Sequence, residues 1–206
     1  MSVSLRCYST SLGCPKNRVD TERLLGSLGV ALVPVESPDE AELVFINTCA
    51  FIQPATEESV RTIAQAIADI EELPKRPLLA VAGCLVGRYH AEDLAPELPE
   101  VDLWLDNSDL EAWPAMLARK LGLPEPTVPG RILSTGPSYA WLKISDGCRH
   151  ACSFCAIPNI RGGHRSHCKD MIVREARALL DQGVKELNLV AQDLTEWGCD
   201  LDGKQD

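Results

Sequence analysis

The residues with the clearest capacity for chemistry are three cysteines in one short stretch. Cys148, Cys152 and Cys155 form a C-x3-C-x2-C pattern directly after a predicted strand. Three thiolates on one loop can hold a metal ion or an iron–sulfur cluster. A set of three leaves one iron open, whereas four cysteines close the site. The pattern therefore favours a cluster whose open iron binds a substrate or cofactor.

A zinc site is the alternative use of this loop. The same three cysteines would then take a fourth ligand from His150, His164 or Cys168, which lie close in the sequence. Phe154 before the last cysteine, the preceding strand and the following helix favour the cluster.

A second set of cysteines recurs at a constant interval in the first half of the chain. Cys14, Cys49 and Cys84 lie 35 residues apart, and each closely follows a predicted strand. The carboxyl ends of parallel strands share one edge of a sheet, where ligands bind. We therefore expect these cysteines to converge on a second three-thiolate iron–sulfur site. The alternative is that each is a small buried core residue.

The composition sets the context for these thiols. The chain has 206 residues, nine cysteines and a net charge of −10, and we expect it to be a cytoplasmic protein that neither spans a membrane nor is exported. Free thiols then replace disulfides. The acidic charge disfavours strong nucleic-acid binding and suits a basic partner. Cys7 is expected to pack in the core, whereas Cys168 and Cys199 have no assigned role.

The elements that must position the first triplet alternate between strand and helix. Strands are predicted over 3–7, 43–46, 78–82 and 101–105, with helices over 15–28, from about 54 to 70, and over 110–121. This alternation predicts an α/β fold, with residues 1–123 forming a small open parallel-sheet domain. Prolines and glycines make residues 124–138 a linker.

The second triplet lies at the start of a second predicted domain, residues 139–206. Its elements are a strand over 139–144, a helix over 169–182 and a strand over 184–190. These two strands and one helix form a βαβ unit that cannot enclose a core, so this domain is either a fragment of a larger one or is completed by something else. The cations Arg161, Arg165 and Lys169 are interpreted as a solvated loop or as contacts to an acidic ligand.

Several stretches together resemble the methylthiotransferase family of radical S-adenosylmethionine enzymes over essentially the whole chain. They are Ser11-Leu12-Gly13-Cys14-Pro15-Lys16-Asn17, Asn47-Thr48-Cys49-Ala50-Phe51-Ile52, Gly83-Cys84-Leu85 and the C-x3-C-x2-C loop. Two stretches resemble the family branch that modifies a ribosomal protein: the one from Cys155 through Arg165-Ser166 and the one from Glu186 to Asp193. Arg165-Ser166-His167-Cys168 departs from the family's Arg-Ser-Arg-Pro.

The resemblance implies two 4Fe–4S clusters. Cys14, Cys49 and Cys84 would hold one, which carries or donates sulfur. Cys148, Cys152 and Cys155 would hold the other, at which S-adenosylmethionine is cleaved to a radical within a partial TIM-like barrel. Phe154 and Gln192 are the residues assigned to cofactor binding, and no protein side chain is assigned as catalytic.

The implied reaction is methylthiolation of the β-carbon of an aspartate on small-subunit ribosomal protein twelve, with a flavodoxin-like reductant as electron donor. The alternatives are a methylthiotransferase acting on adenosine in tRNA and a non-catalytic metal-binding fragment. We expect poor activity from these 206 residues alone, because the family's barrel is longer.

Overall fold

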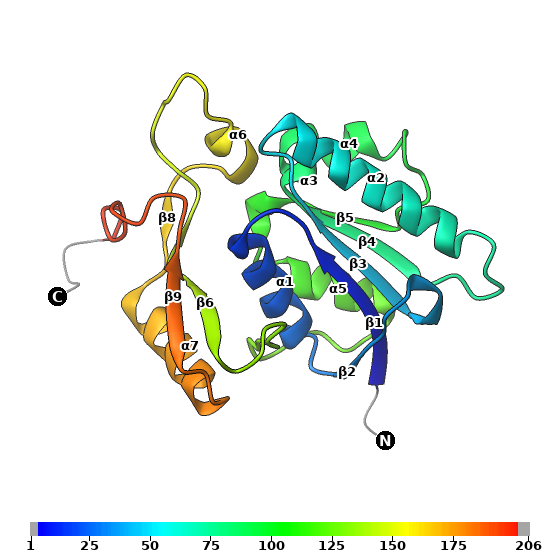
Figure 1. Cartoon of the computed structure of the whole chain (residues 1–206), viewed down its shortest axis with the longest axis horizontal. Helices are drawn as coiled ribbons and strands as arrows, with labels where there is room; N and C mark the ends of the chain where they lie inside the picture. The colour runs from blue at the N-terminus through cyan, green and yellow to red at the C-terminus, as the bar shows by residue number, and fades with distance from the viewer. Residues whose placement is uncertain (1–3, 202–206) are drawn as a thin grey trace. The chain divides into compact units, whose positions relative to one another are not determined.

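The computed structural model describes residues 4–201 and divides the chain into two compact units, one ending at Ile132 and the other beginning at Leu133 (Figure 1). The first unit contains, in chain order, β1 (Ser4–Ser11), α1 (Pro15–Ser27), β2 (Ala31–Pro34), the 3-10 helix η1 (Pro38–Glu40), β3 (Leu43–Thr48), α2 (Gln53–Ile70), β4 (Leu78–Gly83), α3 (Cys84–Tyr89), α4 (Ala91–Leu94), β5 (Leu103–Leu105), η2 (Asn107–Asp109) and α5 (Trp113–Leu121).

The five strands of the first unit form a parallel sheet in the order β2-β1-β3-β4-β5, which confirms the predicted open α/β domain. Figure 1 shows α1 and α5 against one face and α2 and α3 against the other. Alternate residues of β3 serve the two faces: Phe45 packs with α1 and α5, and Val44 and Ile46 are fully buried on the opposite side. Burial on both faces explains why β3 is a continuous apolar run.

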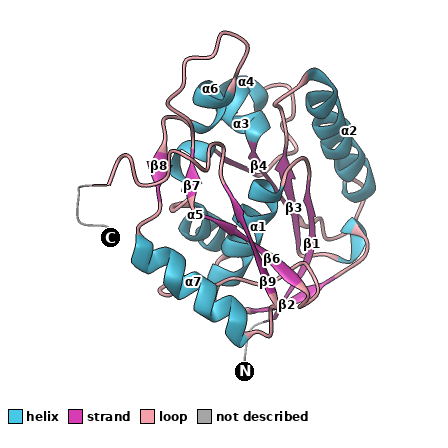
Figure 2. Ribbon diagram, turned by 60° about the vertical axis from the view of Figure 1, so that its left-hand side comes forward, coloured by secondary structure: helices cyan, strands magenta, loops and turns pink. Residues whose placement is uncertain are grey.

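The second unit contains β6 (Tyr139–Lys143), β7 (Ser145–Asp146), α6 (Ile157–Arg161), β8 (Arg165–Ser166), α7 (Lys169–Asp181) and β9 (Glu186–Val190). Strands β6 and β9 pair in parallel, which confirms the βαβ unit, and α7 runs alongside them (Figure 2). Leu179 of α7 is fully buried against Leu142 and Val184. The continuation into a barrel stays a prediction.

Some elements differ from the prediction. The edge strand β2 was not expected, because its four residues are mostly exposed and end in Pro34. The short helices α3, α4 and α6 and the antiparallel pair of β7 and β8 were also missed. Within α2, Val60 is 42% exposed, whereas Ser59 is fully buried.

The proposed boundaries at residues 123 and 138 stay a prediction, but one part of this segment is well anchored. Arg131 donates from Nε and an Nη to Glu22 Oε2 of α1 at 2.9 and 2.7 Å. The carbonyl oxygen of Gly26 lies against Gly130, where a Cβ would come within 2.1 Å of it. Residues 130–132 therefore pack on α1.

Within residues 4–201 no helix has the length and hydrophobicity needed to cross a bilayer.

The thiol of Cys7 is expected to resist alkylation in the folded protein. Cys7 is only 5% exposed in β1, and burial raises its pKa to about 12. At pH 8 only about one thiol in 10⁴ would be ionised, and the thiolate is the reactive form. Mass spectrometry after iodoacetamide treatment should find Cys7 modified only in denaturant, with the exposed Cys168 and Cys199 modified in its absence. Equal labelling of Cys7 and Cys168 would contradict its burial.

The same burial gives a pH dependence. Because the folded pKa of Cys7 is raised, the unfolded chain loses its thiol proton first, near pH 8.5. The contribution of this group to stability is complete below pH 8.5, and it is lost progressively as the pH rises toward about 12. Denaturation of wild type and Cys7→Ala across that range measures the difference.

Candidate metal centres

The first cysteine triplet follows three neighbouring strands. Cys14 caps the start of α1 after β1, Cys49 follows β3, and Cys84 begins α3 after β4. Strands β1, β3 and β4 are adjacent in the sheet, and the strand order reverses between β1 and β3. This switch point is where open parallel sheets bind ligands, at the carboxyl ends of their strands. The topology therefore places the three cysteines along one edge, as predicted.

Asn17 links the three cysteine-bearing loops. Its fully buried side chain donates from Nδ2 to the carbonyl oxygens of Leu12 at 2.9 Å and Thr48 at 2.8 Å. Its Oδ1 accepts a hydrogen bond from Cys84 Sγ at 3.8 Å. One side chain thus contacts the residues that precede the first two cysteine sites and the thiol of the third. Sequence patterns alone assigned Asn17 no such role.

Asn47 and Ser59 also stabilise the loops at this edge of the sheet. Asn47, also fully buried, donates from Nδ2 to the carbonyl oxygen of Asn17 at 2.8 Å. Ser59 Oγ of α2 accepts from the backbone N–H of Cys49 at 3.0 Å and donates to its carbonyl oxygen at 2.7 Å. Ser59 therefore holds both backbone polar groups of Cys49, its N–H and its carbonyl oxygen.

Two glycines allow the loops to approach closely. Gly13 has φ +82°, and a Cβ there would lie 2.7 Å from Cys49 Sγ. Gly83 has φ +98°, and a Cβ there would lie 2.2 Å from Asn47 Oδ1 and 2.6 Å from the Thr48 carbonyl oxygen. Both positions require glycine for conformation and for space.

Replacing Gly83 with alanine is expected to cost roughly 3 kcal/mol of unfolding free energy, because left-handed strain adds to overlap with Thr48. Gly122→Ala is the matched control. Gly122 also has positive φ, at +69°, but a Cβ there meets nothing within 4 Å, so we expect a cost of about 1 kcal/mol. Urea denaturation measures both variants. Equal losses would show that the space beside Cys84 is not restricted.

The second triplet lies on one loop between β7 and α6. The backbone N–H of Cys148 donates to the Gly162 carbonyl oxygen at 3.2 Å, and that of Cys155 to the Cys152 carbonyl oxygen at 3.0 Å. Gly147 has φ +71°, and a Cβ there would lie 2.1 Å from the Gly163 carbonyl oxygen. The loop is therefore held to the segment that follows α6, with Cys152 exposed.

The spacing of the sulfur atoms bears on which metal group fits. Within residues 4–201, neither triplet brings its three sulfur atoms within 4.8 Å of one another. A single tetrahedral zinc ion would hold them about 3.8 Å apart. A cluster of several irons takes each sulfur at a different corner and spreads them further. Three thiols spaced more widely than one ion requires therefore fit a cluster better than one closed ion.

A buried charge network supports the second loop. Asp146 Oδ2 lies 2.8 Å from Lys143 Nζ and 3.0 Å from an Nη of Arg161, and all three side chains are at most 5% exposed. Asp146 Oδ1 also accepts from the backbone N–H of Gly147 at 2.9 Å. Burial alone would raise the pKa of Asp146, but the charges of Lys143 and Arg161 outweigh it and hold the pKa far below the ordinary value.

This network corrects the interpretation of Arg161. It was grouped with Arg165 and Lys169 in a solvated or ligand-binding loop, yet it is 2% exposed and pairs with Asp146. Gln192, at the end of β9, donates from Nε2 to Asp146 Oδ1 at 2.8 Å, which ties it to the base of the cysteine loop. Phe154 lies at the loop surface and is 89% exposed.

The segment after β9 also contacts the cysteine loop directly. His150 Nε2 lies 3.0 Å from Asp193 Oδ2, and Arg149 forms an ion pair with Glu196. The candidate zinc ligand His150 is therefore paired with a carboxylate rather than directed to the thiols. His164 lies with Cys199 and Asp200, and Cys168 is exposed at the start of α7.

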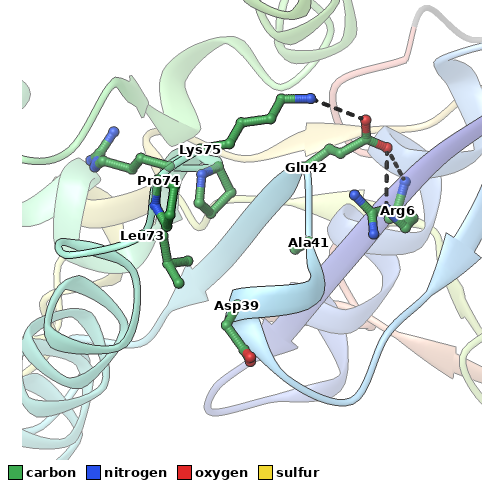
Figure 3. Close-up of a pocket in the computed structure, with 9 residues that line it drawn as sticks. Arg6, Asp39, Ala41, Glu42, Leu73, Pro74 and Lys75 are labelled. Atoms are coloured by element: carbon green, nitrogen blue, oxygen red, sulfur yellow. Dashed lines mark hydrogen bonds and ion pairs between the residues drawn. The ribbon is translucent and has the colours of Figure 1, made fainter.

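A separate pocket of about 300 Å³ lies at the opposite ends of the strands (Figure 3). Glu42 precedes β3, accepts from the backbone N–H of Arg6 at 3.1 Å, and lies 3.9 Å from Lys75 Nζ. Arg76 pairs with Asp102 at 2.8 Å. The basic side chains of this pocket therefore already face carboxylates. The pocket lies at the opposite ends of the strands from the cysteines, so it takes no part in their chemistry.

Comparison with known proteins agrees with this arrangement. The model of the Uncharacterized protein family UPF0004 matches residues 6–106, which span most of the five-stranded sheet. The chain is 70% identical over 194 residues to the ribosomal protein uS12 methylthiotransferase RimO of Nitratidesulfovibrio vulgaris strain DP4. The aligned residues cover 94% of this chain and 45% of the relative. The protein of the same name from Lawsonia intracellularis is 59% identical over 201 residues, covering 97% of this chain and 46% of the relative. The chain thus spans less than half the length of these relatives.

Proposed function

We propose that this chain belongs to the methylthiotransferase family and that it supplies the metal-binding residues of a radical S-adenosylmethionine enzyme. The proposed reaction replaces a β-hydrogen of an aspartate on small-subunit ribosomal protein twelve with a methylthio group. The observation that carries this proposal is the position of Cys14, Cys49 and Cys84 at the carboxyl ends of three adjacent strands. The relatives' names supply the substrate.

We assign one four-iron cluster to each triplet. Cys14, Cys49 and Cys84 would hold the cluster that carries or donates sulfur, with Asn17 fixing the loops around it. The other triplet would hold a cluster that, when bound, supplies the electron needed to break a carbon–sulfur bond of S-adenosylmethionine. A flavodoxin-like protein is the proposed source of that electron.

Two residues of the second unit are assigned to the S-adenosylmethionine molecule. Gln192 Nε2 is engaged by Asp146, and its Oε1 is buried with no hydrogen-bond partner within residues 4–201. That oxygen is suited to accept a hydrogen bond from the amino group of the cofactor. Phe154 is exposed beside Cys155 and can cover the bound cofactor with an aromatic face.

The chemistry of the substrate requires this class of reaction. The β-carbon of an aspartate side chain in a protein carries C–H bonds that no ordinary side-chain base removes at neutral pH, so radical abstraction is needed. The net charge of −10 suits approach to a basic ribosomal protein.

The test separates the two triplets within the complete gene product. After anaerobic reconstitution with iron and sulfide, we expect Cys152→Ala to abolish both 5′-deoxyadenosine formation and methylthiolation of the ribosomal protein. Cys49→Ala should keep 5′-deoxyadenosine formation and lose methylthiolation. Mass spectrometry of the ribosomal protein and of tRNA adenosines identifies the product. Modified tRNA with unmodified ribosomal protein would reject the substrate, and bound zinc without acid-labile sulfide would reject the reaction.

A further inference from the structure

Three metal-binding side chains of the second unit gather outside the cysteine loop. His164, Cys199 and Asp200 each present one ligand atom, and these atoms all lie within 4.8 Å of one another. His164 comes from the segment between α6 and β8, and the other two come from the turn after β9. The set contains an imidazole, a thiol and a carboxylate.

The histidine is buried and incompletely satisfied. Its side chain is 2% exposed, and Nδ1 is buried with no hydrogen-bond partner among the described residues. Its Nε2 lies 3.0 Å from Ser166 Oγ and 3.6 Å from Asp200 Oδ1. Nε2 is therefore the nitrogen that faces Asp200, whereas the unpartnered Nδ1 lies on the other side of the ring.

Ser166 holds the rest of the group in place. Its backbone N–H donates to Asp200 Oδ2 at 2.9 Å, which leaves Oδ1 toward the histidine. Its Oγ accepts from the backbone N–H of Gly198 at 2.8 Å. The two segments that carry the ligands are therefore already connected before any ion binds.

The distances are compatible with one ion. Ligand atoms around a tetrahedral zinc lie about 3.3–3.8 Å apart, and His164 Nε2 and Asp200 Oδ1 are already 3.6 Å apart. Cys199 is exposed, so rotation of its side chain can shorten the remaining distances. Glu196, which accepts a hydrogen bond from the Cys199 thiol, adds negative charge beside the site, although Arg149 offsets part of it.

We propose that His164, Cys199 and Asp200 bind one divalent zinc ion, with water in the fourth position, at a site independent of both cysteine triplets. Nitrogen, sulfur and carboxylate oxygen are the ligand types that zinc prefers. The ion would connect the segment before β8 to the turn after β9. Because the ion binds the folded unit, it should raise the melting temperature.

The test uses the chain with all six triplet cysteines replaced by serine, so that neither candidate cluster site competes. Titration with Co²⁺, a coloured substitute for Zn²⁺, should give one equivalent per chain and a thiolate-to-cobalt charge-transfer band. Cys199→Ser should remove the band. His164→Gln should weaken Co²⁺ binding at least about tenfold. Cys168→Ser is the matched control, since Cys168 is another exposed thiol of the same unit, and it should change nothing.

A second measurement covers the case in which the sixfold variant does not fold. In the chain with intact triplets and reconstituted clusters, competition with a zinc chelator should show one zinc fewer per chain for Cys199→Ser than for Cys168→Ser. Equal zinc content in these two variants, or a cobalt band that survives Cys199→Ser, would overturn the proposal. Because both readouts follow zinc or cobalt alone, they are independent of methylthiolation.

Discussion

Replacing Asp146 with alanine is expected to lower the unfolding free energy of the second unit by about 3–5 kcal/mol, enough to leave it largely unfolded. The carboxylate lies between Lys143 and Arg161, and both cations are 1% exposed at their side chains. Its removal takes this carboxylate away from two buried positive charges that face it. It also removes the acceptor for Gly147 and Gln192, so the base of the cysteine loop would lose its order.

Urea denaturation with far-ultraviolet circular dichroism measures this effect. Asp181→Ala is the control, because Asp181 is an exposed acid of the same unit and should change stability by no more than about 0.5 kcal/mol. Adding Lys143→Met to the Asp146→Ala variant removes one of the two cations that faced this carboxylate and should recover part of the loss. An Asp146→Ala variant as stable as Asp181→Ala would show that the network is not buried as described.

Replacing Asn17 with leucine is expected to cost about 2–4 kcal/mol and to prevent cluster assembly at the first triplet. The side chain supplies both hydrogen-bond donors that reach the carbonyl oxygens of Leu12 and Thr48. Leucine has a similar volume and supplies neither donor, so the buried Thr48 acceptor and the partly buried Leu12 acceptor would each lose a partner, at about 1–3 kcal/mol each. The loops that carry the three cysteines would then separate.

Asn107→Leu is a matched control in the same unit. Asn107 is 1% exposed, but its side-chain nitrogen and oxygen have no hydrogen-bond partner within residues 4–201. Its replacement by leucine should therefore leave stability unchanged or increase it. Denaturation and iron content after anaerobic reconstitution should separate the variants, with iron retained in Asn107→Leu. Equal iron content in both would show that Asn17 does not organise the site.

The sequence predicted the central strands β3 and β4 well because they are buried on both faces. The apolar run of β3 and the turn that follows it at Cys49 can be recognised from the amino-acid sequence alone. The 35-residue interval does not reflect equal units, because the first interval contains α1, β2 and η1 before β3, and the second contains the longer α2 before β4. Each cysteine closely follows a strand of the parallel sheet, so parallel topology was enough to bring them to one edge. The exposed strand β2 carries no such pattern and was missed.

The supporting residues were not predictable in the same way. Arg161 looks like part of a basic surface segment in the sequence, because its partner Asp146 lies 15 positions earlier. Its burial depends on the antiparallel pairing of β7 with β8, two strands of two residues each. Asn17 has the appearance of an ordinary helix residue, and only the adjacency of β1, β3 and β4 reveals what it bridges.

The account depends most on the claim that Cys14, Cys49 and Cys84 hold an iron–sulfur cluster of their own. The direct measurement is iron and acid-labile sulfide content, with Mössbauer spectroscopy, of a chain in which Cys148, Cys152 and Cys155 are alanine. We expect about four irons and four sulfides per chain with the spectrum of a single four-iron cluster, and the loss of both when Cys49→Ser is added. Iron that is absent from the first variant, or that survives Cys49→Ser, would contradict the claim.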